Sequence, residues 1–500
     1  MSVVYLALDQ GTSSTRAMLF DAGGRTVAVV QTPLASNYPT PGWVEQHPED
    51  IWQTSLLVCQ QVLAQAPAGS RVRAMGITNQ RETVMLWERR SGTAVGPAVV
   101  WQDRRTAVDC AQLRADGLES WLQARTGLLA DPYFSATKIR WLLDHVPDAR
   151  RRAEAGELAV GTVDSFLVYR LTEGQRHVTD ATNASRTLLF NLHTGRWDDE
   201  LLRLFNVPAA LLPEIVDSAG SLGVASARWL GTALPITGVA GDQQAALIGQ
   251  ACLQAGMTKS TYGTGCFMLA NAGTQVPTST HRLLGTVAYR FAGQTHYGLE
   301  GSIFVAGVAV QWLRDKLKLV ANAAETEAIA VRREGDARGV VLVPAFVGLG
   351  APQWDADARG LISGLTLDSD ADDLVVATLQ AVAFQTHDLL QAAAGDGVRP
   401  AVLRVDGGMV ANNWLCQFLA DMIDGPVERP EVTETTALGA AMLAALGVGD
   451  VPGLSALHAW WRPERRFEPR MIAATRFALL RGWQQAVERA LTRASPTQGD

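Results

Sequence analysis

The fold of this chain is decided by a stretch near its start, DQGTSSTR at residues 9–16. An apolar, β-branched run at residues 3–8 precedes it, and a second apolar run at residues 17–20 follows. Short apolar runs on both sides of a polar turn predict a β-hairpin with Gly11 in the turn. Its hydroxyl and N–H groups suit the oxygens of a phosphate, and Asp9 is placed to hold a metal ion that bridges them. The alternative is an ordinary polar turn.

The same plan returns near the middle of the chain. Residues 260–269, STYGTGCFML, have the pattern of a strand, a Gly/Thr turn and an apolar strand. Two α/β halves that each begin with such a hairpin predict a duplicated pair of domains with a cleft between them. We place the boundary at residues 247–253, in the helix expected from Asp242 to Gly256, which gives domains at residues 1–248 and 249–500.

Length and charge restrict the class of protein. A chain of 500 residues is too long for one core and suggests two or three domains. An apolar fraction of 47% with 19% charged residues is typical of a soluble globular protein. The net charge of −7 argues against a nucleic-acid partner and against a surface for anionic membranes. We expect the short basic clusters at residues 150–152 and 462–466 to be solvated faces.

Cysteine usage and hydropathy predict a cytoplasmic protein. The five cysteines are scattered without a CxxC pair, which favours free structural thiols in a reducing compartment. The chain enters a strand at once, without the pattern of a signal peptide, and no apolar run reaches the length of a membrane span. We therefore expect no membrane insertion. The last residues, 495–500, have the composition of a loose polar tail.

Asp242 is the sharpest catalytic candidate. It follows a strand expected at residues 235–239 and begins a helix, so the helix dipole favours its ionised form. An ionised carboxylate in that position could accept a hydrogen bond or act as a base. The alternative is a simple helix N-cap, which is common for Asp.

Further polar and aromatic residues follow strand ends. Arg81 and Glu82, between strands expected at residues 72–78 and 83–87, form a donor–acceptor pair suited to adjacent hydroxyls, or a surface ion pair. Tyr133 could donate to the same ligand or simply pack. Trp101 and Phe267 would make apolar walls, or belong to the core.

A glycine pair after a strand is a candidate for a ligand-binding turn, and the common nucleotide-binding motifs are absent. Gly407 and Gly408, after a strand and before a helix, let the backbone approach a flat or anionic ligand. The chain contains no GxxxxGK[ST] stretch and no GxGxxG after a strand. A P-loop and the common dinucleotide fold are therefore excluded.

Taken together, these patterns resemble the FGGY carbohydrate kinases, most closely the members that phosphorylate glycerol. The resemblance covers nearly the whole chain. It rests on residues 9–16 (DQGTSSTR), 79–83 (NQRET), 101–105 (WQDRR), 131–135 (DPYFS), 241–247 (GDQQAAL), 262–268 (YGTGCFM), 360–365 (GLISGL) and 406–408 (DGG). It implies an α/β fold of two actin-like (ribonuclease-H-like) domains that close on ATP.

The resemblance also implies a function and a set of site residues. The activity would be ATP-dependent phosphorylation of glycerol, with Asp242 as general base and Asp9 near Mg²⁺, in a homodimer or homotetramer. Glycerol would be bound by Arg81, Glu82, Tyr133, Asp242 and Gln243, beside Trp101 and Phe267. The nucleotide would be contacted by Thr12, Ser13, Ser14, Arg16, Thr264, Gly307, Gln311, Gly408 and Asn412.

Two alternatives stay open. One is another FGGY kinase, acting on a ketose such as xylulose or on a different polyol, although Arg81, Glu82 and Tyr133 beside an aromatic wall favour a small triol. The other is a non-catalytic, nucleotide-dependent switch on the same fold. The presence of both Asp9 and Asp242 argues against that reading.

Regulation is expected to differ from that of many bacterial relatives. Those proteins have a Gly-rich loop with an arginine. The loop binds the phosphates of fructose 1,6-bisphosphate, and this sugar phosphate inhibits a tetramer. Here residues 227–235 contain a single glycine, and Ala233 stands where the arginine would fall. Residues 214–226 also lack a histidine that could be phosphorylated as in some relatives. We expect activity that is insensitive to this sugar phosphate.

Overall fold

The hairpin predicted at the start of the chain is present. In the computed structural model, which describes residues 2–492, β1 (Val3–Gln10) and β2 (Ser14–Asp21) are antiparallel. The N–H of Gly11 donates to the carbonyl of Ser14 at 3.0 Å and closes the turn. The tail expected at residues 495–500 lies outside the described residues.

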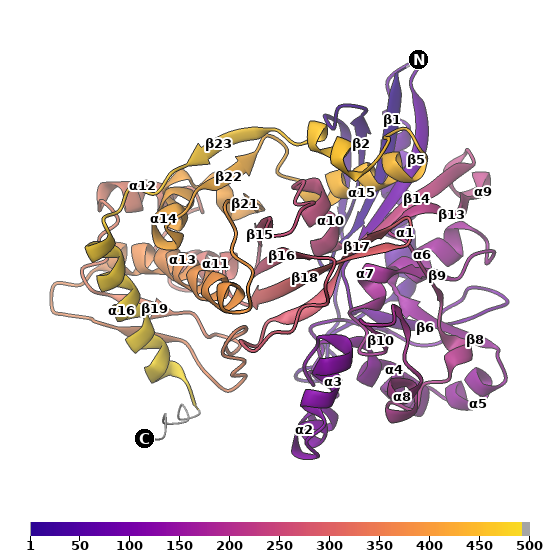
Figure 1. Cartoon of the computed structure of the whole chain (residues 1–500), viewed down its shortest axis with the longest axis horizontal. Coiled ribbons are helices and arrows are strands. Elements are labelled where there is room, and N and C mark those ends of the chain that lie inside the picture. Colours follow the sequence, from indigo (N-terminus) through magenta and orange to yellow (C-terminus); the bar gives the residue numbers. More distant parts are fainter. Residues whose placement is uncertain (1, 493–500) are drawn as a thin grey trace.

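This hairpin belongs to a six-stranded sheet in the first half of the chain (Figure 1). The order across the sheet is β13 (Ala219–Ala225), β14 (Leu234–Gly241), β5 (Arg71–Asn79), β1, β2 and β3 (Thr26–Pro33). β1 pairs in parallel with β5, which pairs in parallel with β14, while β2 and β3 continue the antiparallel side.

The second half repeats this topology. The order of its strands is β17 (Leu284–Phe291), β18 (Gln294–Ile303), β16 (Cys266–Gly273), β15 (Thr258–Tyr262), β21 (Leu403–Asp406), β22 (Val427–Pro430) and β23 (Pro463–Phe467). β15 and β16 form the second hairpin, with β18 antiparallel beyond β16 and with β21 and β22 parallel on the other side of β15. The predicted duplication is confirmed as a repeat of topology.

Shorter strands complete the sheets. A four-stranded sheet has the order β4 (Glu45–Gln46), β7 (Ala98–Val99), β6 (Val84–Glu88) and β8 (Leu158–Thr162). Two-stranded pairs are β9 (Val178–Asp180) with β12 (Glu214–Val216), β10 (Phe190–Asn191) with β11 (Arg196–Trp197), and β19 (Val341–Val343) with β20 (Leu361–Ser363).

Helices surround these sheets. In the first half they are α1 (Pro48–Leu63), α2 (Ala107–Ala115), α3 (Glu119–Thr126), α4 (Ser135–His145), α5 (Ala149–Glu154), α6 (Val163–Leu171), α7 (Ala181–Ala184), α8 (Asp199–Leu204), η1 (Ala209–Leu211), α9 (Ala227–Leu230) and α10 (Asp242–Gly249). They continue as α11 (Gly307–Asp315), α12 (Glu325–Arg332), α13 (Ala371–Gly395), η2 (Gly408–Ala411), α14 (Asn413–Ile423), α15 (Thr435–Gly447), η3 (Leu454–Trp460) and α16 (Ala473–Ala490).

Residues 4–8 of strand β1 are all apolar, and both faces of the strand are buried there. Leu6 and Leu8 point into a core shared with Trp52 of α1, whereas Tyr5 and Ala7 point into a second core shared with α15. Alternation of side chains along a strand explains this division.

Helix α10 is shorter than predicted and packs closely against helix α15 of the second half. The helix that begins at Asp242 was expected to reach Gly256 but ends at Gly249. Helix α15 packs across α10 and onto β14, β5 and β1, so this late segment lies against the first sheet (Figure 1). A Cβ on Gly439 would lie 1.8 Å from the carbonyl oxygen of Ala245, so only glycine allows this approach. The boundary at residue 248 stays a prediction.

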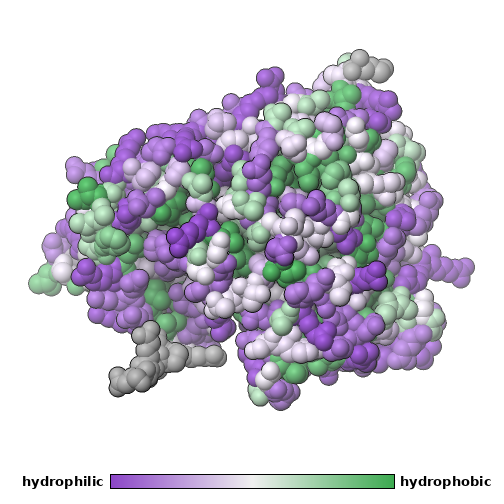
Figure 2. Space-filling view, viewed as in Figure 1, coloured by the Kyte–Doolittle hydropathy of each residue, from purple (hydrophilic) through white to green (hydrophobic). Residues whose placement is uncertain are grey.

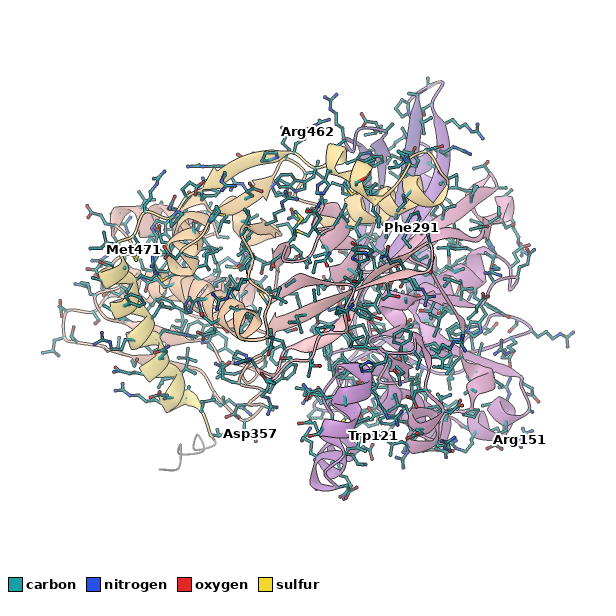
Figure 3. All side chains as sticks on the ribbon, in the orientation of Figure 1. Trp121, Arg151, Phe291, Asp357, Arg462 and Met471 are labelled. Carbon is teal, nitrogen blue, oxygen red and sulfur yellow. The ribbon has the colours of Figure 1, made fainter. Side chains whose placement is uncertain are left out.

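Polar residues cover much of the visible surface, with hydrophobic residues in small patches between them (Figure 2). Arg151 and Arg462, one from each basic cluster, lie at the periphery (Figure 3). Arg152 is paired with Glu88 at 2.6 Å and Arg466 with Glu428 at 2.7 Å, so acidic neighbours offset both clusters. All five cysteines are buried free thiols. Within residues 2–492, no helix has the length and apolar character needed to cross a membrane.

Candidate active site

The ends of two neighbouring strands bring the polar candidates together. Gly241 at the end of β14 is paired with Asn79 at the end of β5. Asp242 therefore begins α10 beside the loop that holds Arg81 and Glu82. The N-cap of α10 is Gly241, so the reading of Asp242 as a simple N-cap is wrong.

Asp242 and Arg81 form an ion pair at the centre of the site. Nε of Arg81 lies 3.0 Å from Oδ1 of Asp242, and the backbone N–H of Gln243 donates to the same oxygen at 2.7 Å. The side chain of Arg81 is buried, whereas that of Asp242 is 31% exposed. Asp242 is thus held in place by fixed donors and still open to a ligand.

Glu82, the residue after Arg81, is held in place by Arg186. It is buried, and Nε of Arg186 donates to its Oε1 at 2.7 Å. Its backbone adopts φ 60°, a left-handed conformation that is uncommon for a side chain of this size and that recurs at functional sites. Burial raises the pKa of Glu82, against the pull of Arg81 and Arg186. The alternative of a surface ion pair is therefore wrong.

Two residues of this cluster, Arg186 and Glu300, were missed by the sequence analysis. Arg186 follows α7, and Nη2 of its guanidinium donates to Oε1 of Glu300 at 2.8 Å. Glu300 lies in β18 and also accepts hydrogen bonds from both Nη atoms of Arg81. Burial alone would raise the pKa of Glu300, but Arg186 and Arg81 hold it below its ordinary value. Glu300 is the only acidic residue of β18, and this isolated carboxylate was the available signal.

Three aromatic side chains stand beside these charges. The ring of Trp101 is 5.6 Å from that of Tyr133 and 6.2 Å from that of Phe267, measured between centroids. Nη2 of Arg81 donates to the hydroxyl of Tyr133 at 3.3 Å. Because Phe267 comes from the second half, the site is built from both halves of the chain.

The residues after Trp101 fix these walls. Arg104 pairs with Asp131 at 2.8 Å, and Asp131 accepts the backbone N–H of Tyr133 at 2.9 Å. The guanidinium of Arg105 lies 3.9 Å from the ring centre of Trp43 and pairs with the buried Asp103 at 2.8 Å. Arg104 thus anchors the loop of Tyr133, and Arg105 and Asp103 hold each other beside Trp43.

The first hairpin lies next to this cluster. Nε1 of Trp101 donates to Oγ1 of Thr12 at 2.8 Å. Ser13 is exposed, and Oγ of Ser14 accepts a hydrogen bond from Gln31 at 2.8 Å. Arg16 pairs with Glu434, which joins the hairpin to the second half.

A pocket of about 490 Å³ lies in the second half. Its lining includes five predicted nucleotide contacts, Thr264, Gly307, Gln311, Gly408 and Asn412. A Cβ on Gly307 would lie 2.5 Å from the carbonyl oxygen of Gly263, and a Cβ on Gly408 would meet no atom within 4 Å. The absence of a side chain at Gly307 thus allows close backbone packing against Gly263, and its absence at Gly408 leaves open space in the pocket.

Asp9 fits a magnesium ion that also has phosphate ligands. Its carboxylate takes part in no hydrogen bond or ion pair with the residues described, although the side chain is half-buried. Burial, opposed by Arg16 and reinforced by Asp242, raises the pKa of Asp9 to about 6. Within residues 2–492 there is no group of three or more His, Cys, Asp or Glu that could hold a metal alone. Mg²⁺ commonly uses one or two carboxylates together with substrate phosphates.

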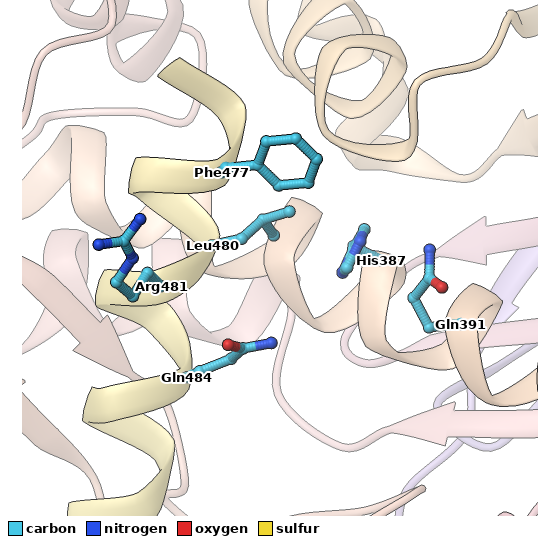
Figure 4. Close-up of a pocket in the computed structure, with 6 residues that line it drawn as sticks. All are labelled: His387, Gln391, Phe477, Leu480, Arg481 and Gln484. Carbon is cyan, nitrogen blue, oxygen red and sulfur yellow. The ribbon is translucent and has the colours of Figure 1, made fainter. Parts of the chain in front are cut away.

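A separate pocket of about 510 Å³ lies between α13 and α16 (Figure 4). His387 and Gln391 face it from α13, and Phe477, Leu480, Arg481 and Gln484 face it from α16. None of the predicted site residues lines it, so it is not the candidate active site.

Two α/β halves of one topology, which meet at a buried charged cluster with aromatic walls, agree with a kinase of small polar substrates. The chain belongs to the FGGY family of carbohydrate kinases: the model of the N-terminal domain matches residues 4–249 and that of the C-terminal domain matches residues 258–448.

Full-length relatives agree with this family. The chain is 59% identical to a glycerol kinase of Rhodospirillum centenum, with 97% of each chain covered, and 57% identical to glycerol kinase 1 of Pseudomonas aeruginosa, with 99% of this chain and 100% of the relative covered. Among solved structures it is similar to Plasmodium falciparum glycerol kinase with ADP, with a TM-score of 0.91, 36% identity and coverage of 98% and 99% of the two chains.

Proposed function

We propose that this chain transfers the γ-phosphoryl group of ATP to glycerol and forms sn-glycerol 3-phosphate. The observation that carries the proposal is the identity of 59% to a glycerol kinase across 97% of this chain. The enclosed cluster of Arg81, Glu82 and Tyr133, beside the wall of Trp101, agrees with a small polyol.

Glycerol would be bound where the charged cluster meets the aromatic walls. Glu82 accepts from hydroxyl groups, and Arg81 and Gln243 donate to them. Trp101 and Phe267 cover the carbon chain. These side chains are fixed by Arg186, Glu300 and Asp131 before the substrate arrives, which lowers the entropic cost of orienting it.

The nucleotide would lie between the first hairpin and the second-half pocket. Thr12, Ser13, Ser14 and Arg16 contact its phosphates from one side and Thr264 from the other. Gly307, Gln311, Gly408 and Asn412 contact the rest of the nucleotide. Asp9 would hold Mg²⁺, which when bound offsets the negative charge of the phosphates.

Asp242 would act as the general base. Its carboxylate takes the proton of a terminal glycerol hydroxyl as that oxygen bonds to the γ-phosphorus. The bond from the γ-phosphorus to the bridging oxygen of ATP breaks, and ADP leaves with the electron pair. Closure of the two halves would exclude water from the transferred group.

A coupled assay of ADP release tests this function. We expect turnover with glycerol, little with xylulose and almost none without a substrate. The product should be oxidised by a dehydrogenase specific for sn-glycerol 3-phosphate. Faster turnover with xylulose would support the other FGGY kinases, and binding of ATP without turnover of any polyol would support a switch.

The assembly and location implied by the resemblance are also proposals. We infer a homodimer or homotetramer in the cytoplasm, with glycerol and ATP as its small-molecule partners. Light scattering of the purified protein would measure the assembly directly.

A further inference from the structure

A buried lysine that the catalytic mechanism does not use lies beside the site. Lys259, on strand β15, is fully buried. Its Nζ donates to three acceptors: Oε1 of Gln243, Oγ1 of Thr261 at 2.9 Å and the carbonyl of Phe267 at 3.3 Å. An ammonium has three N–H groups, so each of them has a partner.

The charge of Lys259 is balanced by the site itself. Burial lowers the pKa of Lys259, while Asp406, Asp242 and Glu300 oppose that shift and Arg81 adds to it. An ammonium removed from water persists only with such compensation. The lysine is therefore part of the charged cluster and not an isolated buried charge.

The lysine also decides which way the amide of Gln243 points. The oxygen and nitrogen of an amide are similar in shape, and only their partners distinguish them. Lys259 can donate but cannot accept, so the atom of Gln243 that faces it is the oxygen. The NH₂ group of Gln243 then faces away from Lys259 and is free to act as a donor.

We propose that Lys259 is a positioning residue that orients Gln243 as a hydrogen-bond donor to glycerol and anchors Phe267 beside it. The inference rests on the proposed function and adds a residue to its substrate-binding side. Because Lys259 and Phe267 belong to the second half and Gln243 to α10, the lysine also makes glycerol binding depend on contact between the halves.

The orientation of the amide can be tested without altering the lysine. Gln243→Glu keeps the oxygen that faces Lys259 but replaces the donor with a second acceptor. We expect this variant to lose glycerol affinity at least as strongly as Gln243→Ala, about tenfold for one hydrogen bond. Calorimetry with glycerol and no ATP avoids repulsion between the new carboxylate and the phosphates. Gln243→Glu binding within about twofold of the wild type would overturn the proposed orientation.

Lys259→Met tests the lysine directly. We expect KM for glycerol to rise about tenfold while KM for ATP changes little, because a flipped amide removes one hydrogen bond. On the Gln243→Ala background, the same substitution should raise KM only about twofold further, since the lysine acts mainly through Gln243. Lys316→Met, at an exposed lysine, is the matched control and should match the wild type.

The outcomes separate this inference from the proposed function. A folded Lys259→Met variant with unchanged KM for glycerol, or effects that multiply fully in the double variant, would overturn the role of Lys259. If Lys259→Met does not fold, the Gln243→Glu comparison decides the orientation alone. Absence of glycerol turnover in the wild-type protein would instead overturn the proposed function.

Discussion

Nε of Arg81 lies 3.0 Å from Oδ1 of Asp242, while both Nη atoms of the same guanidinium donate to Glu300. One planar cation thus joins the start of α10 to strand β18. Because Glu300 shares the charge of Arg81, Asp242 is oriented without being its sole partner. This sharing is the basis of the prediction for Glu300 below.

Asp242→Asn should abolish turnover and leave the fold intact. The amide keeps the shape of the side chain but cannot take the proton of the attacking hydroxyl. Loss of a general base costs about 10²–10⁴-fold in rate. Steady-state kcat, with a thermal melt as the control for folding, would check this. Retention of more than about a tenth of wild-type kcat would contradict the assigned role.

Glu82→Ala should raise KM for glycerol about tenfold or more, because a charged acceptor for its hydroxyls is lost. ATP affinity measured without glycerol should change little. Glu82→Gln, which preserves shape, is the matched control and should show a smaller effect. A similar loss of ATP affinity would mean that Glu82 supports the cleft as a whole.

Glu300→Gln should weaken both stability and glycerol binding. The variant leaves Arg81 and Arg186 with only Glu82 and Asp242 to balance two buried cations. Breaking a buried ion pair costs about 3–5 kcal/mol, although the amide should recover part of this through its oxygen. A lower Tm together with a raised KM for glycerol is expected. Unchanged values for both would show that Glu300 is dispensable.

Lys138→Met should change the pH dependence of stability. Lys138 is buried, and within residues 2–492 its Nζ donates only to the carbonyl of Tyr133, at 2.8 Å. Burial lowers its pKa to about 7. Between pH 7 and its ordinary value of about 10.4, the unfolded chain holds a proton that the folded chain has lost, so stability rises with pH.

Below pH 7 Lys138 is charged in the folded chain as well, so the wild type bears the full cost of burying this charge. We expect the Tm of Lys138→Met relative to wild type to be more favourable at pH 6 than at pH 9.5. Thermal melts at both pH values, with Lys316→Met as the surface control, would measure it. A difference that does not depend on pH would mean that Lys138 stays charged throughout.

Activity should not respond to fructose 1,6-bisphosphate. Residues 227–230 form the short helix α9, and the guanidinium of Arg228 lies 4.7 Å from the ring centre of Trp229 and 3.7 Å from Glu173. A bisphosphate needs converging N–H groups beside a guanidinium. The side chain of Arg228 is instead 71% exposed and already paired with Glu173. Titration of the sugar phosphate at fixed glycerol and ATP would check this. A saturable loss of activity would contradict it.

The sequence determined the hairpins and the residues that follow strand ends. DQGTSSTR lies between two short apolar runs, and that local pattern was enough to predict β1 and β2. Asp242 and Arg81 were found from the same kind of local pattern. Each follows a buried strand, and a polar side chain at a strand end more often serves a site than packs in the core. Turn chemistry and side-chain alternation act over a few residues and can therefore be read locally.

The tertiary structure decided which charges share one site. Arg186 and Glu300 are 114 residues apart and meet only because β18 passes next to the residues that follow α7. Lys259 and Gln243 likewise meet only where β15 approaches α10. Helix α15 returns to the first sheet because Gly439 allows its backbone to approach α10 closely. Contacts of this kind depend on the packing of distant segments, and no local pattern in the sequence encodes them.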